Sequence, residues 1–462
     1  MKFQKTVALS LAVAAAAAGM AGCGGKNGEV EGKINVTVGG WPTETNPKSQ
    51  ETYNGWVEEL KTTNPDINII PDTGSYADNR SFQVKAAANQ LPTVWDTHLT
   101  EVKQTIKSGY AADITEILKE KGLMDALNPA ILALGEKDGK YYALPKNAYL
   151  MGLTVNKNLF EEAGLVNADG TVMVPDTYEQ MAEYAKIIKE KTGKAGFAIC
   201  TTNNCGGWHF MNIAWSYGVK FMEQRDDGTW EATFNTQEAV DALQFVKDLQ
   251  WKYGVLPEDK VIDQPTIHKL LGVGQAAMIF EAPTSDYSQK YGLDPKKVAM
   301  VKMPKGPAGR YVQTGGSVYM FSPTATKEQL EGAFTWIETT GFKKVLDDEA
   351  IAAQEKSMQN TIDENGIVFP GVAVPLWINE ERVKQDDELR AKYSQVDKKD
   401  FESYYDISDV TLHEEEPMAC QQLYAVLDGC IQEVITNENA DCKALIENAC
   451  KDFQTNHLDK LD

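Results

Sequence analysis

Short apolar segments alternate with longer amphipathic ones along this 462-residue chain. The amphipathic stretches have the three- and four-residue spacing of helices, and the apolar runs have the length of strands. This alternation is typical of α/β folds with largely parallel sheets, and the length suits two domains or one two-lobed unit. The expected strands are Ile34–Val38, Ile67–Ile70, Gly196–Cys200, Ala276–Glu281 and Ser317–Phe321.

Several of the expected helices have recognisable ends. One carries Tyr53 and Trp56 on its apolar stripe and stops at Asn64-Pro65. Two others begin after side chains that suit helix caps, Asp176 or Thr177 in one case and Asn235 or Thr236 in the other. The last two helices, over 416–435 and 440–453, are joined by a short polar linker, which predicts an antiparallel αα-hairpin.

The N-terminus has the pattern of an export signal. Lys2 and Lys5 precede the apolar run Val7–Met20, which is too short for a membrane span. Met20-Ala21-Gly22-Cys23 then resembles the bacterial lipobox, in which the cysteine is acylated and becomes the mature N-terminus. We therefore expect a lipoprotein signal peptide over 1–22, a lipid on Cys23, a tether over 23–33 and attachment to the cell membrane from outside the cytoplasm.

The formal net charge of −22 argues against nucleic acid as a partner, because nucleic-acid binding is driven by basic groups that displace counterions. No Cys-x-x-Cys pair occurs and the five histidines are scattered, so no metal site is expected. The sequence predicts no cofactor, a monomer, and membrane contact through the N-terminal lipid alone.

Six cysteines remain after Cys23, an even number that permits disulfides outside the cytoplasm. Cys420 and Cys430 are about 15 Å apart along one helix, too far for a disulfide, which needs Cα atoms within about 7 Å. In an antiparallel hairpin, however, Cys430–Cys442 and Cys420–Cys450 would face each other at two levels. We expect these two bridges and a loop bridge Cys200–Cys205; the alternative is that some cysteines are free core residues.

The tetrapeptide Asp72-Thr73-Gly74-Ser75 matches the catalytic motif of aspartic proteases. That chemistry needs two aspartates sharing a proton, and the chain contains no second copy of the motif. Since the motif directly follows the strand Ile67–Ile70, we interpret it as a turn at the carboxyl end of a strand. Tyr76 is then a candidate for contact with a ligand.

Several stretches in order resemble the family 1 extracellular solute-binding proteins of bacterial ABC importers. They include "AAANQLPTVWDT" (86–97), "DGKYYALPKNAYLMGLTVNKNLFEEAGL" (138–165), "GQAAMIFEAP" (274–283) and "LYAVLDG" with "TNENADCKAL" near the end. The resemblance spans about 30–460. It implies a periplasmic binding protein fold of type II, with two α/β lobes, a multi-strand hinge, and a ligand cleft between the lobes.

The same resemblance places the crossings between the lobes in "LPKNAYLMG", in "GGSVYMF" and around "NGIVFPGVA". It implies a first lobe over 34–147 and 318–368 and a second lobe over 148–317 and 369–462. The implied function is capture of a carbohydrate, most simply an oligosaccharide, by closure of the lobes and its delivery to the permease of an ABC importer for sugar transport.

Sugars present flat CH-rich faces and hydroxyl edges, so a sugar site needs aromatic rings and hydrogen-bonding side chains, carboxylates above all. In open α/β sheets, the loops after the strands line the cleft. Candidate ligand-binding residues are those that follow a strand, lie in the first crossing, or stand where the family has ligand contacts. They are Trp41, Glu44, Tyr76, Thr97, His98, Glu101, Tyr149, Trp208, Glu281 and Trp377. Trp56, Trp230, Trp251 and Trp336 are interpreted as structural.

Two departures from the maltodextrin binders weaken a maltose assignment, since Thr284 and Leu423 stand where those proteins have tryptophans. Two other classes of function stay open. A secreted glycan hydrolase would need two carboxylates about 5–10 Å apart, and acidic residues are abundant. A binder of peptides, polyamines or glycerol phosphodiesters could share the fold.

Overall fold

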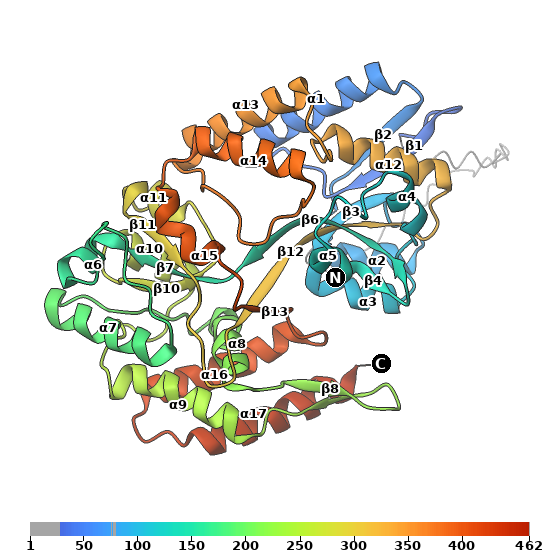
Figure 1. Ribbon diagram of the computed structural model, residues 1–462. Coiled ribbons are helices and arrows are strands. Elements are labelled where there is room, and N and C mark those ends of the chain that lie inside the picture. The colour runs from blue at the N-terminus through green and yellow to red at the C-terminus, as the bar shows by residue number, and fades with distance from the viewer. Residues whose placement is uncertain (1–27, 75, 77–79, 462) are drawn as a thin grey trace, which may run out of the picture.

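The computed structural model describes residues 28–74, 76 and 80–461, and the chain forms two α/β lobes joined by paired strands (Figure 1). The two-lobed α/β fold predicted from the sequence is thereby confirmed. The signal, Cys23 and the first part of the tether lie outside the described residues.

The first lobe is built on the parallel strands β1 (Ile34–Gly39), β2 (Ile67–Asp72) and β3 (Val94–His98), with β1 between the other two. Val36 and Val38 of β1 are buried in its core. Helices α1 (Pro47–Thr63) and α12 (Lys327–Thr339) contact each other, and α12 packs on β1. The lobe also contains α2 (Arg80–Ala87), α3 (Val102–Lys107), α4 (Thr115–Glu120), α5 (Pro129–Leu132), two 3-10 turns (Leu99–Glu101 and Ala133–Gly135) and the small hairpin β4 (Glu136–Lys137) and β5 (Lys140–Tyr141).

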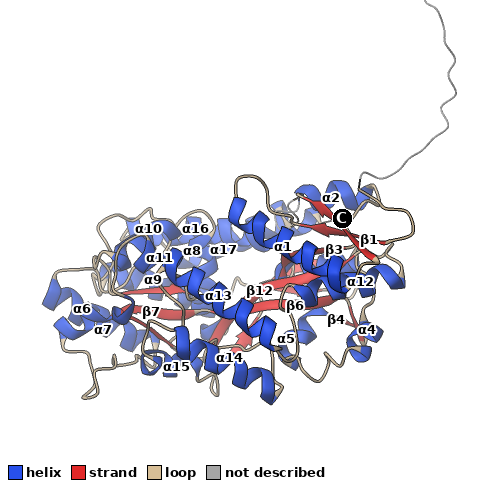
Figure 2. Ribbon diagram, turned by 90° about the horizontal axis from the view of Figure 1, so that it is seen from above, coloured by secondary structure: helices blue, strands red, loops and turns tan. Residues whose placement is uncertain are grey.

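Two long strands, β6 (Ala143–Leu150) and β12 (Tyr311–Phe321), pair antiparallel and connect the lobes (Figures 1 and 2). Leu144 and Phe321 are buried in the core of the first lobe, whereas Leu150 and Val312 are buried in the core of the second. Each strand therefore has one end anchored in each lobe, which agrees with the first two crossings that the resemblance implied.

The sheet of the second lobe differs from the parallel arrangement that we expected. Strand β7 (Gly152–Asn156) pairs antiparallel with both β10 (Met278–Glu281) and β11 (Val298–Val301). The expected strand Gly196–Cys200 forms only isolated bridges. A Cβ at Gly196 would come within 2.0 Å of the Ala185 carbonyl oxygen, so this segment runs against a helix and does not form a regular ladder.

Helices cover the second lobe, and two of them begin where the sequence predicted. The Thr177 hydroxyl accepts from the Gln180 amide at 3.1 Å and starts α7 (Tyr178–Thr192), and Thr236 caps α9 (Gln237–Trp251) in the same way. The other elements of this lobe are α6 (Lys157–Ala163), α8 (Cys205–Tyr217), α10 (Gln264–Gly272), α11 (Asp286–Gln289), α15 (Glu402–Tyr405), the hairpin β8 (Met222–Gln224) and β9 (Trp230–Ala232), β13 (Thr411–His413) and 3-10 turns at Pro295–Lys297, Lys398–Phe401 and Leu458–Lys460.

The predicted αα-hairpin is formed by α16 (Cys420–Thr436) and α17 (Cys442–Asn456), but its two disulfides are not. All four hairpin cysteines are buried and free. Cys442 Sγ lies 3.5 Å from Gln244 Oε1 on α9, and Cys450 Sγ lies 3.5 Å from the Ala232 carbonyl on β9. The expectation of two bridges was wrong. Spacing gives the level of a side chain along a helix but not its partner, and these two thiols lie against Gln244 and the Ala232 carbonyl instead of being bonded to Cys430 and Cys420.

The chain also passes between the lobes just after the segment 365–373, in which the third crossing was expected. Val374 is buried in the core of the second lobe and Trp377 in the core of the first. Helices α13 (Asp348–Asn365) and α14 (Glu380–Tyr393) contact each other (Figure 1) and enclose a small core of Leu346, Ala350 and Leu389. The residue boundaries given above for the two lobes stay a prediction.

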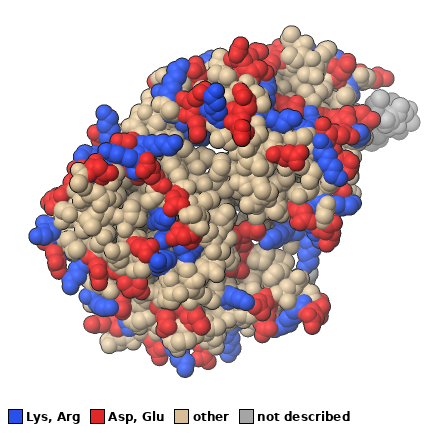
Figure 3. Space-filling view, in the orientation of Figure 1, with Lys and Arg blue, Asp and Glu red and all other residues tan. Residues whose placement is uncertain are grey.

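Charged side chains of both signs cover the visible surface of the two lobes (Figure 3). Acidic side chains are spread over both lobes on the face seen in Figure 3, with basic side chains between them. Within residues 28–461, apart from the four that the structure does not describe, no helix is both long enough and apolar enough to cross a membrane.

Candidate functional site

A cavity of about 360 Å³ lies between the lobes, and we call it the cleft cavity. The first lobe contributes the end of β3, the residues after it and Leu134, and the hinge contributes parts of β6 and β12. The second lobe contributes the starts of α8 and α10, the segment before α16 and the first turns of α16. Its lining consists of His98, Leu99, Thr100, Lys103, Leu134, Tyr149, Asn203, Asn204, Cys205, Trp208, Gln264, Thr314, Gly315, Gly316, Glu414, Glu415, Pro417, Gln421 and Tyr424.

Trp208 reaches the cavity from the first turn of α8, and three features fix that turn. The predicted disulfide Cys200–Cys205 is present, with Cα atoms 5.5 Å apart. Asn204 has a φ of 67°, in the left-handed region that asparagine tolerates better than most residues. The Asp428 carboxylate on α16 accepts hydrogen bonds from the amides of Asn204 and Gly207, both at 2.7 Å.

Close contact between α8 and α16 explains the glycine at position 207. A Cβ there would lie 2.4 Å from the Tyr424 carbonyl oxygen, so only glycine allows the two helices to approach this closely. The contact brings Tyr424, on α16, into the same cavity wall as Trp208. The second lobe thus presents two aromatic side chains to the cleft.

Glu415 is a carboxylate in this wall with neutral partners. Its Oε1 accepts from Gln313 Nε2 at 2.8 Å, and its other donors are the Tyr424 hydroxyl and the Trp208 indole. Burial raises the pKa of Glu415, and these hydrogen bonds offset part of the increase. A half-buried carboxylate with neutral partners can accept further hydrogen bonds from the hydroxyl groups of a bound molecule.

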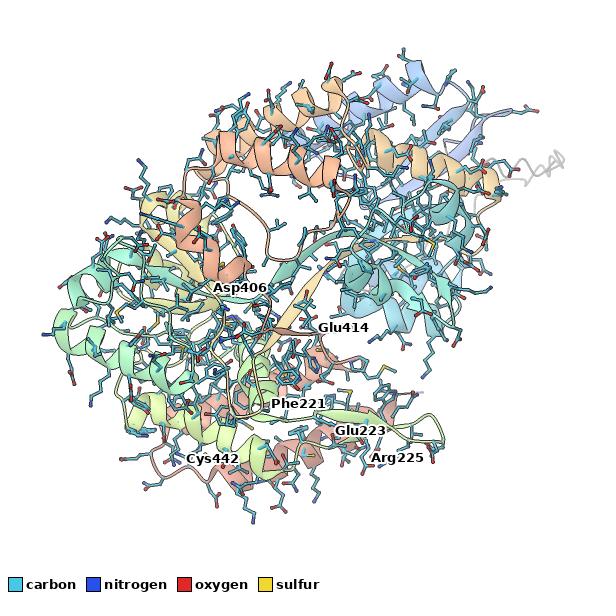
Figure 4. All side chains as sticks on the ribbon, viewed as in Figure 1. Phe221, Glu223, Arg225, Asp406, Glu414 and Cys442 are labelled. Carbon is cyan, nitrogen blue, oxygen red and sulfur yellow. A yellow bond between two sulfur atoms is a disulfide. The ribbon has the colours of Figure 1, made fainter. Side chains whose placement is uncertain are left out.

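Glu414 spans the cleft. Its Oε2 lies 2.6 Å from Lys103 Nζ on α3 of the first lobe, and Figure 4 shows Glu414 between the two lobes beside the lower part of β12. Both side chains are substantially exposed, so the pair stabilises the observed arrangement by no more than about 1 kcal/mol. A contact this weak can break and form again as the lobes move.

Three of the predicted ligand residues line the cleft cavity: His98, Tyr149 and Trp208. They come from the first lobe, the hinge and the second lobe, respectively. Burial, followed by the charge of Glu415, raises the pKa of Tyr149, so its hydroxyl stays protonated and can donate a hydrogen bond.

Two predicted tryptophans are core residues instead. Trp41 is 6% exposed and stacks on Trp336, with ring centroids 5.7 Å apart, because the loop after β1 folds its side chain between α1 and α12. Trp377 is 4% exposed and packs on Phe342 at 4.8 Å and under Arg382. Neither ring lines the cleft cavity in this structure, so their contact with a ligand stays a prediction.

Four further candidates stand outside the lining of the cavity. Tyr76 is buried and donates to Asp72 Oδ2 at 2.7 Å, and Thr97 is buried with its hydroxyl 3.4 Å from the Tyr76 carbonyl. Their side chains are used inside the first lobe. Glu44 is exposed in the turn before α1. Glu101 is half-buried near His98, and burial raises its pKa.

Glu281 supports the cavity without lining it. Its Oε2 lies 2.6 Å from His268 Nε2 and accepts from Gln264 Nε2 at 2.9 Å. His268 is held on its other side by Asp286 at 3.2 Å. Because Gln264 does line the cavity, this buried network fixes the orientation of a residue in the wall. Direct contact of Glu281 with a ligand stays a prediction.

Sequence reasoning missed most polar residues of the wall. Glu414 and Glu415 belong to the acidic run "HEEEP" directly before a helix, and that run was the available signal. Tyr424 and Gln421 lie on a helix whose apolar spacing predicts packing. Gln264 follows no predicted strand, so nothing local distinguished it.

The structure also shows one grouping of possible metal ligands among the described residues. Cys200, Cys205 and His209 have donor atoms within 4.8 Å of one another. The two sulfurs are joined in the disulfide, so they are not thiolates, which is the form that binds metal. The grouping therefore does not form a metal site in this state of the protein.

The fold and the cleft define a two-lobed binding protein, and comparison with known proteins gives its family. Residues 45–341 match the family described as bacterial extracellular solute-binding protein, and the chain belongs to that family. It is a solute-binding protein of the kind that serves ABC transporters, and the family consists of binding proteins rather than enzymes.

Individual relatives are distant. A Brucella abortus protein that is provisionally described as a binding protein is 23% identical to this chain. The match covers 64% of this chain and 70% of the Brucella protein. The melibiose/raffinose/stachyose-binding protein of Bacillus subtilis is 25% identical over 37% of each chain. The GacH receptor of Streptomyces glaucescens, solved with and without acarbose, superposes with a TM-score of 0.63 at 18% identity, covering 93% of this chain and 99% of its own. At that identity, the likeness shows the shared fold.

Proposed function

We propose that this protein captures a neutral oligosaccharide in the cleft cavity and delivers it to the permease of an ABC importer. The observation that carries the proposal is the composition of the cavity wall. Trp208, Tyr149 and Tyr424 supply aromatic surface, and Glu415 supplies a carboxylate with neutral partners. Rings for the CH faces of a sugar beside an acceptor for its hydroxyl groups are what carbohydrate recognition requires.

Capture works through closure of the lobes. A ligand shifts the balance between open and closed forms only if it binds the closed form more tightly. Both lobes contribute to the cavity, with His98 and Lys103 on one side and Trp208 and Glu415 on the other. A sugar that contacts both sides therefore favours closure, and the two hinge strands β6 and β12 carry the movement.

A thermal-shift screen tests this function. The panel contains raffinose, stachyose, maltotriose and arabinotriose, with trigalacturonate, spermidine and glycerophosphocholine as charged alternatives. At a thousandfold excess over Kd, a specific ligand stabilises the protein by about 4 kcal/mol. We expect a neutral oligosaccharide to stabilise it and the charged compounds to have no effect. Stabilisation by spermidine or glycerophosphocholine alone contradicts the proposal, and released monosaccharide after incubation points to hydrolysis.

The affinity for the oligosaccharide is expected to fall as the pH is lowered. The ionised form of Glu415 accepts hydrogen bonds from sugar hydroxyls, and burial raises its pKa above the usual glutamate value. The carboxylate is therefore protonated at a higher pH than an exposed glutamate, and binding weakens as the pH falls through that raised value, while it is constant above it. Titration calorimetry from pH 7.5 down to pH 5 measures this.

Glu415→Gln isolates this effect. At neutral pH the variant should bind about 1.5–3 kcal/mol more weakly, the usual contribution of a hydrogen bond to a charged group, and it should lose the acid-dependent part of the change. Glu438→Gln is the matched control, because Glu438 is exposed in the linker between α16 and α17 and does not line the cavity. Equal affinity and pH profile in wild type and Glu415→Gln would remove Glu415 from the site.

Lipid attachment at Cys23 is a second part of the proposal. The support is the basic start, the apolar run and the lipobox-like Met20-Ala21-Gly22-Cys23. Cys23→Ala is expected to prevent acylation and to release the protein into the soluble extracytoplasmic fraction. A variant that still sediments with washed membranes contradicts the assignment.

A further inference from the structure

A second cavity, of about 200 Å³, lies in the first lobe beside the hinge, and we call it the side pocket. It opens among α1, α12, the carboxyl end of β1 and the first three residues of β3. Its lining consists of Val38, Gly39, Tyr53, Trp56, Val94, Trp95, Asp96, Lys146, Tyr319, Trp336 and Thr340. It shares no lining residue with the cleft cavity.

Five of the eleven residues that line the side pocket are aromatic. Tyr53 and Trp56 of α1 are 5.0 Å apart between ring centroids, and Trp336 of α12 stands edge-on to Trp56 at 6.1 Å. Trp336 is buried, but Tyr53 and Trp56 are only partly buried. The sequence pattern assigned Trp56 to the core, whereas the structure leaves part of its surface open to the pocket.

The polar side of the pocket is an ion pair. Lys146 Nζ lies 2.8 Å from Asp96 Oδ2, and the side chains are 31% and 40% exposed. Lys146 also lies over the Tyr319 ring, 5.3 Å from its centroid. Donors and acceptors that are still open to solvent therefore stand beside flat apolar surface.

The residues that line the side pocket indicate which kind of ligand it can bind. A cationic ligand would meet Lys146, which already occupies both the carboxylate and the face of Tyr319. An anionic ligand would meet Asp96. A neutral ring with one CH-rich face and hydroxyl groups at its edge matches both the aromatic walls and the ion pair. The volume is below the roughly 300 Å³ at which pockets take drug-sized ligands, so it suits a single ring.

The side pocket and the cleft cavity are close along the hinge. On β6, Lys146 lines the side pocket and Tyr149, three residues later, lines the cleft cavity. On β12, Tyr319 lines the side pocket and Gly316, three residues earlier, lines the cleft cavity. Three residues correspond to about 10 Å along a strand. On β3, Asp96 stands two residues before His98. One set of strands therefore supplies residues to both cavities.

We infer that the side pocket is a second carbohydrate subsite, which takes one neutral pyranose or furanose ring between Trp56 and the Lys146–Asp96 pair. The inference rests on the proposed function, because it names a further place at which the same class of ligand is held. The ring is either the end of the oligosaccharide in the cleft or a separate sugar molecule, and the binding stoichiometry distinguishes these sources.

The test uses the full chain labelled with 5-fluorotryptophan, with the Trp56 and Trp208 signals assigned from Trp56→Phe and Trp208→Phe. The probe is whichever of raffinose, stachyose, maltotriose and arabinotriose stabilises the protein most in the thermal-shift screen. Calorimetry with the same sugar compares wild type with Trp56→Ala, which removes a wall, and Thr340→Trp, which fills the pocket. Trp251→Ala is the control, because Trp251 is 39% exposed on α9 and lines neither cavity.

We expect the fluorine signals of both Trp56 and Trp208 to move when the sugar is added. Trp56→Ala and Thr340→Trp should each lose about tenfold or more in affinity, as for an aromatic anchor, or lose one of two binding events, while Trp251→Ala binds normally. One site per chain indicates a shared oligosaccharide, and two sites indicate a separate molecule.

Three results overturn the inference. If the Trp208 signal moves but the Trp56 signal does not, and both pocket variants bind like wild type, the side pocket is empty and the proposed function stands. If the Trp56 signal moves while both variants keep normal affinity and stoichiometry, the movement is transmitted from the cleft. If neither signal moves with any sugar of the panel, the proposed function fails as well.

Discussion

Replacing Trp336 with alanine is expected to lower the free energy of unfolding by about 3–5 kcal/mol, the usual cost of removing a buried tryptophan or phenylalanine side chain. Trp336 is 3% exposed and lies at the centre of the aromatic cluster between α1 and α12. It stacks on Trp41 at 5.7 Å and contacts Tyr53 at 6.0 Å. The surrounding rings are rigid, so they collapse only partly into the space that is left.

Urea-induced unfolding followed by circular dichroism measures this loss. Trp251→Ala is the matched control, because its side chain is 39% exposed and makes one hydrogen bond, from Nε1 to the Val434 carbonyl at 2.8 Å. We expect the control to lose clearly less stability than Trp336→Ala. A loss below about 1 kcal/mol for Trp336→Ala, within the range of ordinary surface substitutions and weak contacts, would show that this cluster does not stabilise the first lobe.

Trp208→Ala is expected to weaken oligosaccharide binding by about 1–3 kcal/mol, roughly 5- to 150-fold, as for other aromatic anchors. The ring is partly exposed in the cleft cavity and is held by a turn that does not depend on it. That turn is fixed by the disulfide Cys200–Cys205 and by the bonds from the amides to Asp428. The stability of the unliganded protein should therefore change little.

Calorimetry and a thermal melt of the unliganded variant give the two readouts. Trp208→Phe is the control that keeps an aromatic face, and it should recover most of the affinity if stacking is the main contribution. Equal affinity of Trp208→Ala and wild type would contradict the assignment of the site. A large fall in melting temperature without ligand would instead assign Trp208 to packing.

Much of the fold could be predicted because its signals are local. The strands β1 and β2 are apolar runs bounded by turns, and the Thr177 and Thr236 caps depend on side chains within one helical turn. The predicted disulfide Cys200–Cys205 is also local, because it joins two cysteines only five residues apart. The antiparallel pairing of β7 with β10 and β11 depends on contacts between segments more than a hundred residues apart.

The candidate site was less predictable, and the tryptophans show why. Trp41 and Trp208 both follow glycines in loops, and the sequence treats them alike. Trp41 is enclosed by α12, which comes almost three hundred residues later, whereas Trp208 stays partly open beside α16. Glu415 becomes a wall residue because Gln313 of the hinge and Tyr424 of α16 position it.

Local periodicity was enough to predict the α/β class and the hairpin of α16 and α17. The motifs in order indicated the family, and the resemblance to that family implied the first two crossings of the hinge. Which rings are open to solvent, which cysteines meet and which carboxylates face the cleft depends on the tertiary structure. Burial and pairing of that kind depend on distant segments that pack against a residue. A sequence pattern records the spacing along one element, but not the neighbours that the fold brings to it.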